Sequence, residues 1–159
     1  MNKFCKLSSK GIVFYERPNS IPYSYRITYR VAILCLLMRI CSPRKGCSLV
    51  KMHIINDGLK DSTLVNRIKK DLQLNIHSAL IRFEPALNRA LEYALYEGLI
   101  VQQGNGKYKL TVRGNEFTND LLKDEDVFQN EKEKLSVLFD EFDDDIIEKL
   151  LIKWGVNDD

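Results

Sequence analysis

The stretch EGLIVQQGNGKYKLTVRGNEF, residues 97–117, decides the fold that we predict for this chain. Two β-prone runs, LIVQQ and KYKLT, flank Gly-Asn-Gly, whose glycine and asparagine residues accept the positive φ angles of a tight turn. A helix should end just before the first run, because Gly98 suits a left-handed stop, and another should begin after Thr111, which suits an N-cap. A β-hairpin placed between helices in this way is typical of a winged helix-turn-helix.

Outward from the hairpin, apolar residues recur at the three- and four-residue spacing of amphipathic helices. N-terminal to it we predict helices in residues 23–41, from Cys47 or Ser48 to a frayed end near Asp57 and Gly58, from Asp61 or Ser62 onward, and in residues 85–97, where Pro85 suits the first turn. The segment 74–83 suits either a helix or a strand. C-terminal to the hairpin we predict helices in residues 112–124, 130–142 and 143–154, the last two forming a helical hairpin.

The predicted fold class is therefore α+β: a mainly helical winged helix-turn-helix with a β-hairpin wing and a C-terminal helical extension. In this prediction residues 1–22 form an N-terminal arm or a short strand, residues 23–124 form the winged-helix domain, and residues 125–159 form an acidic C-terminal helical hairpin. A chain of 159 residues is long enough for one compact core with one accessory element.

The composition argues against several classes of protein. Apolar residues make up 45% and charged residues 29% of the chain, which is ordinary for a globular protein and argues against wholesale disorder. The longest apolar run, VAILCLLM at residues 31–38, is far shorter than the roughly 20 residues that a membrane span requires. The N-terminus has no apolar stretch of signal-peptide length, so we expect a cytoplasmic location.

Charge is segregated along the chain, although the net charge is only +2. Residues 1–119 contain 19 Lys/Arg and 8 Asp/Glu, a balance of +11, whereas residues 120–159 contain 5 and 14, a balance of −9. Such asymmetry indicates that the basic part meets a polyanion. The acidic tail either meets a basic partner or folds back on its own chain.

The sequence contains no evident catalytic pattern. His53 and His77 lie far apart in the chain, no serine or cysteine lies in a nucleophile motif, and Gly-Asn-Gly lacks the lysine of a phosphate loop. The spacing of the cysteines fits no zinc knuckle, and structural disulfides are unexpected in a cytosolic chain; they are Cys5, Cys35, Cys41 and Cys47. We therefore expect a protein that is not an enzyme, with no cofactor and no metal.

The helix at residues 85–97 is the one that would enter a DNA groove in a winged helix, because it precedes the hairpin. Its predicted outward positions are Asn88, Arg89, Glu92, Tyr93, Tyr96 and Glu97. One arginine against two glutamates makes a poor groove reader, because phosphate neutralisation drives DNA affinity and acidic side chains oppose it. We therefore expect this face to bind a protein partner, with Arg89, Glu92, Tyr93 and Tyr96 as contacts.

The hairpin itself is better supplied with basic groups. Lys107 and Lys109 are two residues apart on one strand and so share a face, and Arg113 opens the next helix. Together with Gln103 they suit a grip on a DNA backbone without base reading. Arg67 and Lys70 form a further basic group. The alternative is that all of these side chains are simply solvated charges.

The C-terminal helices carry a wide apolar face that either the body of the protein or a partner must cover. The residues that we expect to contact a partner there are Phe139, Phe142, Ile147, Leu151 and Trp154. The same residues could instead belong to the core.

Four stretches carry a more particular resemblance: RITYRVAILCLL, CSLVKMHIINDGL, RFEPALNRALEYALYEGLI and GKYKLTVRGNEFTNDL. Over roughly residues 20–155 the chain resembles the small middle components of bacterial three-component ABC-ATPase defence operons, including the Lamassu type. The second helix departs from that pattern, because NDGL stands at residues 56–59 where the relatives carry an acidic residue followed by an aromatic one. The resemblance implies a non-catalytic subunit of an anti-phage or anti-plasmid complex. It would bridge a coiled-coil SMC-like ATPase and an effector nuclease, with sequence-independent contact to double-stranded DNA.

The alternative function is a stand-alone, dimeric winged-helix transcription regulator that binds duplex DNA through the wing and another basic face. Terminal helices often pair in such dimers, and residues 127–154 suit that role. A regulator should be basic on the outer face of residues 85–97, which this chain is not, so we favour the subunit.

Overall fold

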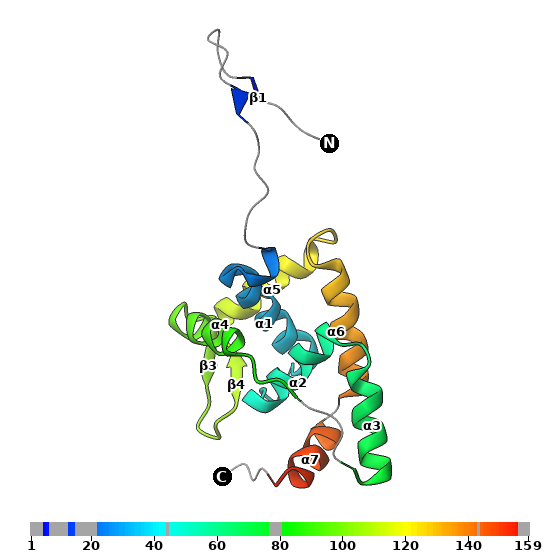
Figure 1. Ribbon diagram of the computed structural model, residues 1–159. Coiled ribbons are helices and arrows are strands. Elements are labelled where there is room, and N and C mark those ends of the chain that lie inside the picture. Colours follow the sequence, from blue (N-terminus) through cyan, green and yellow to red (C-terminus); the bar gives the residue numbers. More distant parts are fainter. Residues whose placement is uncertain are drawn as a thin grey trace.

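The computed structural model describes residues 5–6, 13–14, 22–43, 45–76, 81–142 and 144–155. These ranges are mainly helical, with two small antiparallel strand pairs, consistent with the predicted α+β class (Figure 1). The elements are β1 (Cys5–Lys6), β2 (Val13–Phe14), the 3-10 helix η1 (Tyr23–Tyr25), α1 (Ile27–Cys41), α2 (Leu49–Lys60), α3 (Leu64–Leu74), α4 (Pro85–Tyr96), β3 (Ile100–Gln102), β4 (Tyr108–Leu110), α5 (Val112–Lys123), α6 (Gln129–Glu141) and α7 (Asp144–Lys153). No described helix is long and apolar enough to cross a bilayer.

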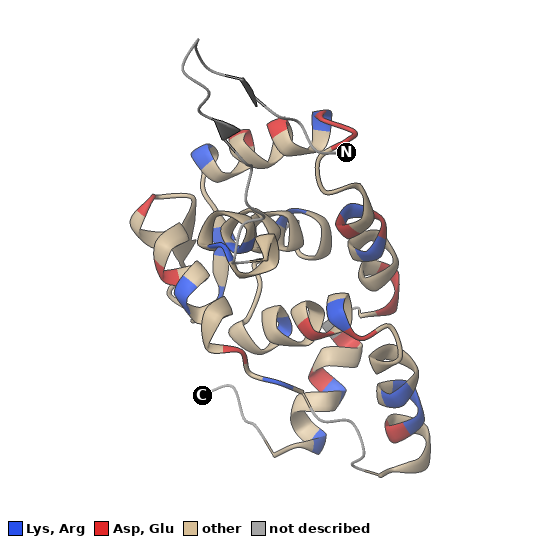
Figure 2. Ribbon diagram, turned by 45° about the horizontal axis from the view of Figure 1, so that its top comes forward, with Lys and Arg blue, Asp and Glu red and all other residues tan. Residues whose placement is uncertain are grey.

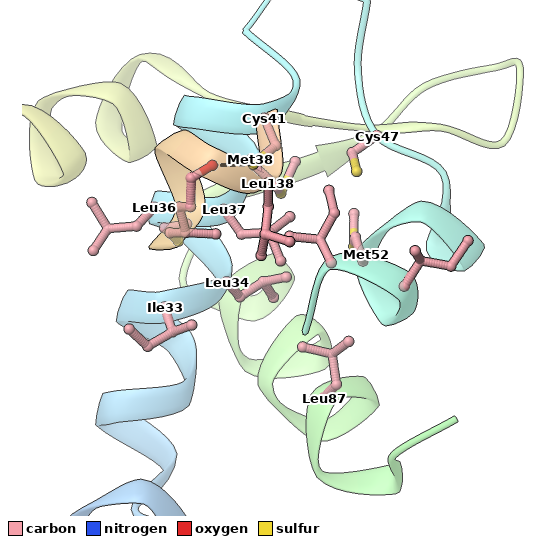
Figure 3. Packing of buried hydrophobic residues seen from close by; sticks show 14 of the residues in the cluster. Ile33, Leu34, Leu36, Leu37, Met38, Cys41, Cys47, Met52, Leu87 and Leu138 are labelled. Atoms are coloured by element: carbon pink, nitrogen blue, oxygen red, sulfur yellow. Dashed lines mark hydrogen bonds between the residues drawn. The ribbon is translucent and has the colours of Figure 1, made fainter. Parts of the chain in front are cut away.

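Helix α1 is the centre of the core. Leu34, Cys35, Leu36 and Leu37 are all fully buried, and α1 packs against α2, α4, α5 and α6 (Figure 3). A helix that other elements cover on several sides is apolar around its circumference, which explains the uninterrupted apolar run in the sequence. Each buried leucine contributes roughly 1.5–3 kcal/mol through removal of its side chain from water.

Helix α2 begins where the sequence predicts and ends later. Ser48 is its N-cap, because the Ser48 Oγ accepts the backbone N–H of Lys51 at 3.2 Å. The predicted fraying near Asp57 and Gly58 is wrong, because α2 continues to Lys60. Gly58 lies under α6, and a Cβ added to it would stand 3.0 Å from a methyl group of Leu138. The glycine therefore permits the close approach of α6 and does not end the helix.

The segment between α2 and α4 holds an additional helix, α3. Leu64 and Ile68 are fully buried on its inner face. The sequence offers Asp61 and Ser62 as N-caps, but Thr63 is the N-cap residue and the helix begins at Leu64. The Asp61 carboxylate accepts the N–H of Thr63 at 2.9 Å just before the helix. Residues 81–84 are neither helix nor strand, so neither reading of the segment 74–83 holds over its last three residues; its residues 77–80 lie outside the described ranges.

The predicted hairpin forms in the expected place. β3 and β4 pair antiparallel, with Ile100 opposite Leu110. Gly106 has a φ of +77° in the turn, whereas Asn105 does not adopt the positive φ that we expected and instead accepts the N–H of Lys107 at 3.1 Å. The expected stop at Gly98 is confirmed by its φ of +67°.

Cys47 pairs with β4 through a single antiparallel bridge and so adds a short third strand position beside the hairpin. The backbone N–H of Cys47 donates to the Tyr108 carbonyl at 2.8 Å, and the Tyr108 N–H donates back to the Cys47 carbonyl at 2.9 Å. The loop between α1 and α2 is thereby attached to β4, so the hairpin base is fixed to the helical body.

Helix α5 begins at a tight contact with the hairpin. Thr111 caps it as predicted, since its Oγ1 accepts the N–H of Gly114 at 3.0 Å. A Cβ added to Gly114 would lie 2.0 Å from the carbonyl oxygen of Leu99, closer than any real contact. Glycine at residue 114 is therefore what lets the first turn of α5 lie against the strand entrance.

The two C-terminal helices share the core with the other helices. α6 packs against α1 and α2, and Leu135, Leu138 and Leu150 belong to the same buried cluster as the leucines of α1. Figure 3 shows Leu138 among the side chains of α1 and α2. Residues 125–155 therefore do not form a separately packed unit beside residues 23–124.

Candidate protein and nucleic-acid interfaces

The outer face of α4 is exposed as predicted. The six expected outward residues are all solvent-exposed: Asn88, Arg89, Glu92, Tyr93, Tyr96 and Glu97. The tyrosines stand out most, with Tyr93 55% and Tyr96 89% exposed. Exposed tyrosines combine a flat apolar ring with a polar hydroxyl, the combination that protein interfaces favour. We use the name α4 face for these six residues.

The Arg113 guanidinium contacts Glu97 of the same chain. Its Nη1 donates to the Glu97 carbonyl at 2.7 Å, and its Nη2 lies 3.7 Å from the Glu97 carboxylate. This guanidinium therefore satisfies a carbonyl that the end of α4 leaves open. The Thr111 hydroxyl donates to the Gly98 carbonyl at 2.7 Å, so two contacts hold the start of α5 against the end of α4. The prediction that Arg113 is free for DNA is corrected accordingly.

The β3–β4 hairpin, which is the predicted wing, offers two lysines, and we call them the wing lysines. Lys109 is exposed and Lys107 half-buried, and neither ammonium forms an ion pair with any residue that the structure describes. Gln103 does not join them, because its Oε1 is buried without a hydrogen-bond partner and lies where a Cβ on Gly46 would be only 2.5 Å away. The side chain of Gln103 packs against the α1–α2 loop, so this predicted DNA contact is wrong.

The basic group on α3 is separate from the wing. Arg67 forms an ion pair with Asp61, and Lys69 pairs with Glu141 of α6, whereas Lys70 is exposed. Figure 1 shows α3 and the β3–β4 hairpin on opposite sides of the molecule. The two basic groups named from the sequence therefore do not make one surface.

Most of the predicted partner residues of the tail are core residues. Phe142 is 1%, Ile147 5% and Leu151 8% exposed, because they belong to the same buried cluster as the apolar side chains of α1 and α2. Their assignment as partner contacts is wrong in this structure. Phe139 is 46% exposed and Trp154 half-buried, so these two remain available at the surface.

The acidic tail also folds back on the basic part of the chain. Beyond the ion pair of Lys69 with Glu141, the Tyr29 hydroxyl donates to the Glu131 carboxylate at 2.9 Å. The first turn and a half of α6 alternates in charge through Glu131, Lys132, Glu133 and Lys134. Figure 2 shows basic and acidic segments interspersed over the described helices, so neither sign occupies one side of this view alone.

A partly buried polar junction at the start of α4 was not foreseen from the sequence. The Glu84 carboxylate accepts hydrogen bonds from Arg30 at 2.9 Å, from Asn56 at 3.1 Å and from Lys60. Burial alone would raise the pKa of Glu84, but the hydrogen bonds from Arg30, Lys60 and Asn56 outweigh it and lower the pKa to about 2. A glutamate before Pro85 could have indicated a helix start, but nothing in the sequence pointed to its partners on α1 and α2.

His53 belongs to the same junction. It is fully buried, and its Nδ1 accepts the backbone N–H of Glu84 at 3.2 Å. The proton therefore lies on Nε2, which donates to the Asn88 Oδ1 at 3.0 Å. Burial lowers the pKa of His53, so the neutral ring is the stable form. With both nitrogens bonded to α4, His53 fixes this helix and has no free nitrogen for catalysis.

Cys35 and Cys41 are poor nucleophiles. Cys35, Cys41 and Cys47 are buried in the core, and burial raises the pKa of Cys35 and of Cys41 to about 12. Within the described ranges no three His, Cys, Asp or Glu side chains gather as a metal site would require.

The geometry therefore presents three features: the exposed α4 face, the two wing lysines, and the polar junction behind the start of α4. The first two are open to macromolecules, and the third holds α4 in place. Comparison with protein-family models, with curated proteins and with solved structures found no match to this chain.

Proposed function

We propose that this chain is a non-catalytic winged-helix subunit of a bacterial anti-phage or anti-plasmid defence complex. In this proposal the α4 face docks on protein, and the chain bridges a coiled-coil SMC-like ATPase and an effector nuclease. The wing lysines add sequence-independent contact to double-stranded DNA. The observation that carries the proposal is the α4 face, where Tyr93 and Tyr96 stand exposed and two glutamates oppose a single arginine.

The order of elements supports the winged helix. Helix α1, the bridging residue Cys47, helix α2, helix α4 and the β3–β4 hairpin follow one another as the helices and strands of that fold do. Helix α3 is then an insertion between the two helices of the helix-turn-helix. The backbone bridge between Cys47 and Tyr108 supplies the third strand position beside the wing.

The electrostatics of the α4 face favour protein over DNA as its ligand. A helix in a DNA groove is surrounded by phosphates, so Glu92 and Glu97 would be repelled at the position where Arg89 alone attracts. Tyr93 and Tyr96 together offer two rings that a protein surface can cover. The sequence resemblance to the defence components supports a multisubunit setting for that contact.

The second candidate, a dimeric regulator, has one observation in its favour. Apolar side chains remain exposed on the terminal helices, with Val137 61% and Phe139 46% exposed on α6 and Ile152 70% exposed on α7. Terminal helices with exposed apolar residues suit pairing with a second copy. DNA binding in that case would depend on the wing lysines.

Purification of the tagged chain, expressed with its neighbouring genes, tests the proposal. A coiled-coil ATPase should co-purify in fixed stoichiometry, and the double variant Tyr93→Ala with Tyr96→Ala should lose at least about tenfold of that recovery, as expected for interface tyrosines. The matched control, Glu148→Ala with Lys149→Ala on α7, changes two exposed residues away from the α4 face and should recover it fully. A free dimer with salt-sensitive, sequence-specific DNA affinity would establish the regulator instead.

A further inference from the structure

A pocket separate from the α4 face and the wing lies beside the polar junction. It has a volume of about 380 Å³ and is lined by α1, by the C-terminal end of α2, and by the first turns of α4 and α6. Ile33, Leu59 and Leu87 supply apolar lining. The volume lies within the range of roughly 300–1,000 Å³ that small-molecule sites occupy.

Arg30 brings a buried donor without an acceptor to this pocket. Its side chain is only 10% exposed, and its Nη2 pairs with Glu84 at 2.9 Å. The Arg30 Nε is buried and has no hydrogen-bond partner within the described ranges. Buried donors are nearly always satisfied in folded proteins, so this N–H requires an oxygen from a ligand or from water.

The residues that line the pocket also favour a ligand that carries negative charge. Glu84 is occupied by Arg30, Lys60 and Asn56, and the Glu131 Oε1 accepts the Tyr29 hydroxyl at 2.9 Å. Lys134, on the α6 side of the pocket, has no acceptor among the residues that the structure describes. The exposed donor of the lining is thus the Lys134 ammonium, near the mostly buried Arg30 guanidinium, and a carboxylate or phosphate suits this pair of cations.

Aromatic rings border the same pocket. Tyr23 is 63% and Tyr25 68% exposed, and the Tyr23 ring meets Tyr29 edge-on with 5.1 Å between centroids. Three tyrosines could in principle cage a cation. However, the Arg30 guanidinium already lies 5.7 Å from the Tyr25 centroid, and Lys60 and Lys134 also line the pocket, so a further cation would be repelled.

We propose that this pocket binds a small molecule consisting of a flat aromatic ring and an anionic group. The anion lies beside Lys134 and the Arg30 guanidinium, and the ring lies against Tyr23 and Tyr25. A mononucleotide and an aromatic carboxylate share this chemistry. The inference does not depend on the proposed function, because no residue of the α4 face takes part.

Isothermal titration of the full-length chain tests the site with four probes: adenosine monophosphate, 4-hydroxybenzoate, inorganic phosphate and choline. At least one aromatic anion should bind with a Kd below about 1 mM. Lys134→Ala and Tyr25→Ala should each weaken that binding about tenfold, because they remove the open cation and the exposed ring. Both residues are exposed, so both variants should keep the thermal midpoint of the parent protein.

The matched control is Lys149→Ala, which removes a lysine that is exposed outside the pocket and should leave the Kd unchanged. Preference for adenosine monophosphate or for 4-hydroxybenzoate distinguishes a nucleotide from a carboxylate as the ligand class, and either result supports the site. Three results would overturn it: no binding of either aromatic anion, binding of inorganic phosphate as tight as that of the aromatic anions, or preferential binding of choline.

Discussion

Single residues at the start of α4 determine how that helix is held. Glu84 collects donors from α1 and α2, and His53 bonds both the backbone of Glu84 and the side chain of Asn88. Because Arg30, Asn56 and His53 are largely removed from water on folding, each needs its partner in place. The α4 face is thus presented by a rigid base, which reduces the entropy lost when a partner binds.

The pKa of Glu84 gives a pH-dependent prediction. Its folded-state pKa of about 2 lies below the ordinary value of 4.5, so the carboxylate stabilises the fold fully above about pH 4.5 and loses that effect as the pH falls towards 2. After allowance for solvent screening of this partly exposed carboxylate, the shift corresponds to roughly 1–2 kcal/mol in the free energy of unfolding. Urea unfolding of Glu84→Gln should therefore show a shallower loss of stability between about pH 5 and pH 2 than the parent protein. Glu148→Gln, on the exposed side of α7, should follow the parent curve.

The contact at Gly114 gives a second prediction at this scale. Gly114→Ala places a methyl group against the Leu99 backbone carbonyl, so α5 or the strand entrance must move. We expect a loss of at least about 2 kcal/mol in the free energy of unfolding. Gly104→Ala is the matched control, because nothing lies within 4 Å of its added Cβ and its φ is not positive. Equal stability of the two variants would show that the close contact does not constrain α5.

At the scale of elements, the β3–β4 hairpin carries basic side chains that are available for contact with DNA. Lys107 and Lys109 remain unpaired among the described residues, whereas Arg113 is occupied by Glu97 and Gln103 packs against the α1–α2 loop. A grip on DNA by this element thus depends on two charges, and it should be weak and independent of sequence.

Charge reversal in the wing tests that grip. Lys107→Glu with Lys109→Glu should weaken association with unrelated duplexes and reduce the slope of log K against log salt by about two. Lys123→Glu with Lys149→Glu applies the same change of net charge to exposed residues of α5 and α7 and should leave the slope nearly unchanged. If both double variants lower affinity alike, only net charge matters and the wing lysines are solvated surface groups.

The elements also show what sequence periodicity can predict. The hairpin, the stop at Gly98 and the caps at Ser48 and Thr111 were predictable because each depends on neighbours within a few residues. The continuation of α2 through Gly58 was not, because the reason for that glycine is Leu138, eighty residues further along the chain. The helix propensities of individual residues carry no information about such a distant contact.

The candidate surfaces divide in the same way. Exposure of the α4 face followed from its helical periodicity, and the structure confirms it. The contacts that Arg113, Gln103 and Arg67 make within the chain could not be predicted from their neighbours in the sequence. The polar junction and the pocket beside it could not be predicted, because Arg30 and Asn56 lie on two different helices and Glu84 precedes a third.

At the scale of the whole molecule, the acidic tail completes the fold. The charge segregation along the sequence suggested either a partner or self-association of the two parts. The ion pair of Lys69 with Glu141 and the burial of Phe142, Ile147 and Leu151 correspond to the second alternative. Helix α6 covers α1 and α2, so the chain needs its C-terminal helices to close its core.

A matched pair of phenylalanines tests that conclusion. Phe142 is 1% exposed and Phe139 46% exposed, although they lie only three residues apart at the end of α6. Phe142→Ala should lower the free energy of unfolding by about 3–5 kcal/mol, since it removes a core ring and leaves a cavity, whereas Phe139→Ala should cost much less. Chemical unfolding of the isolated chain measures both. If Phe142→Ala unfolds like the parent protein and only loses a partner, the tail is a docking element that the body does not need, and the core must close without it.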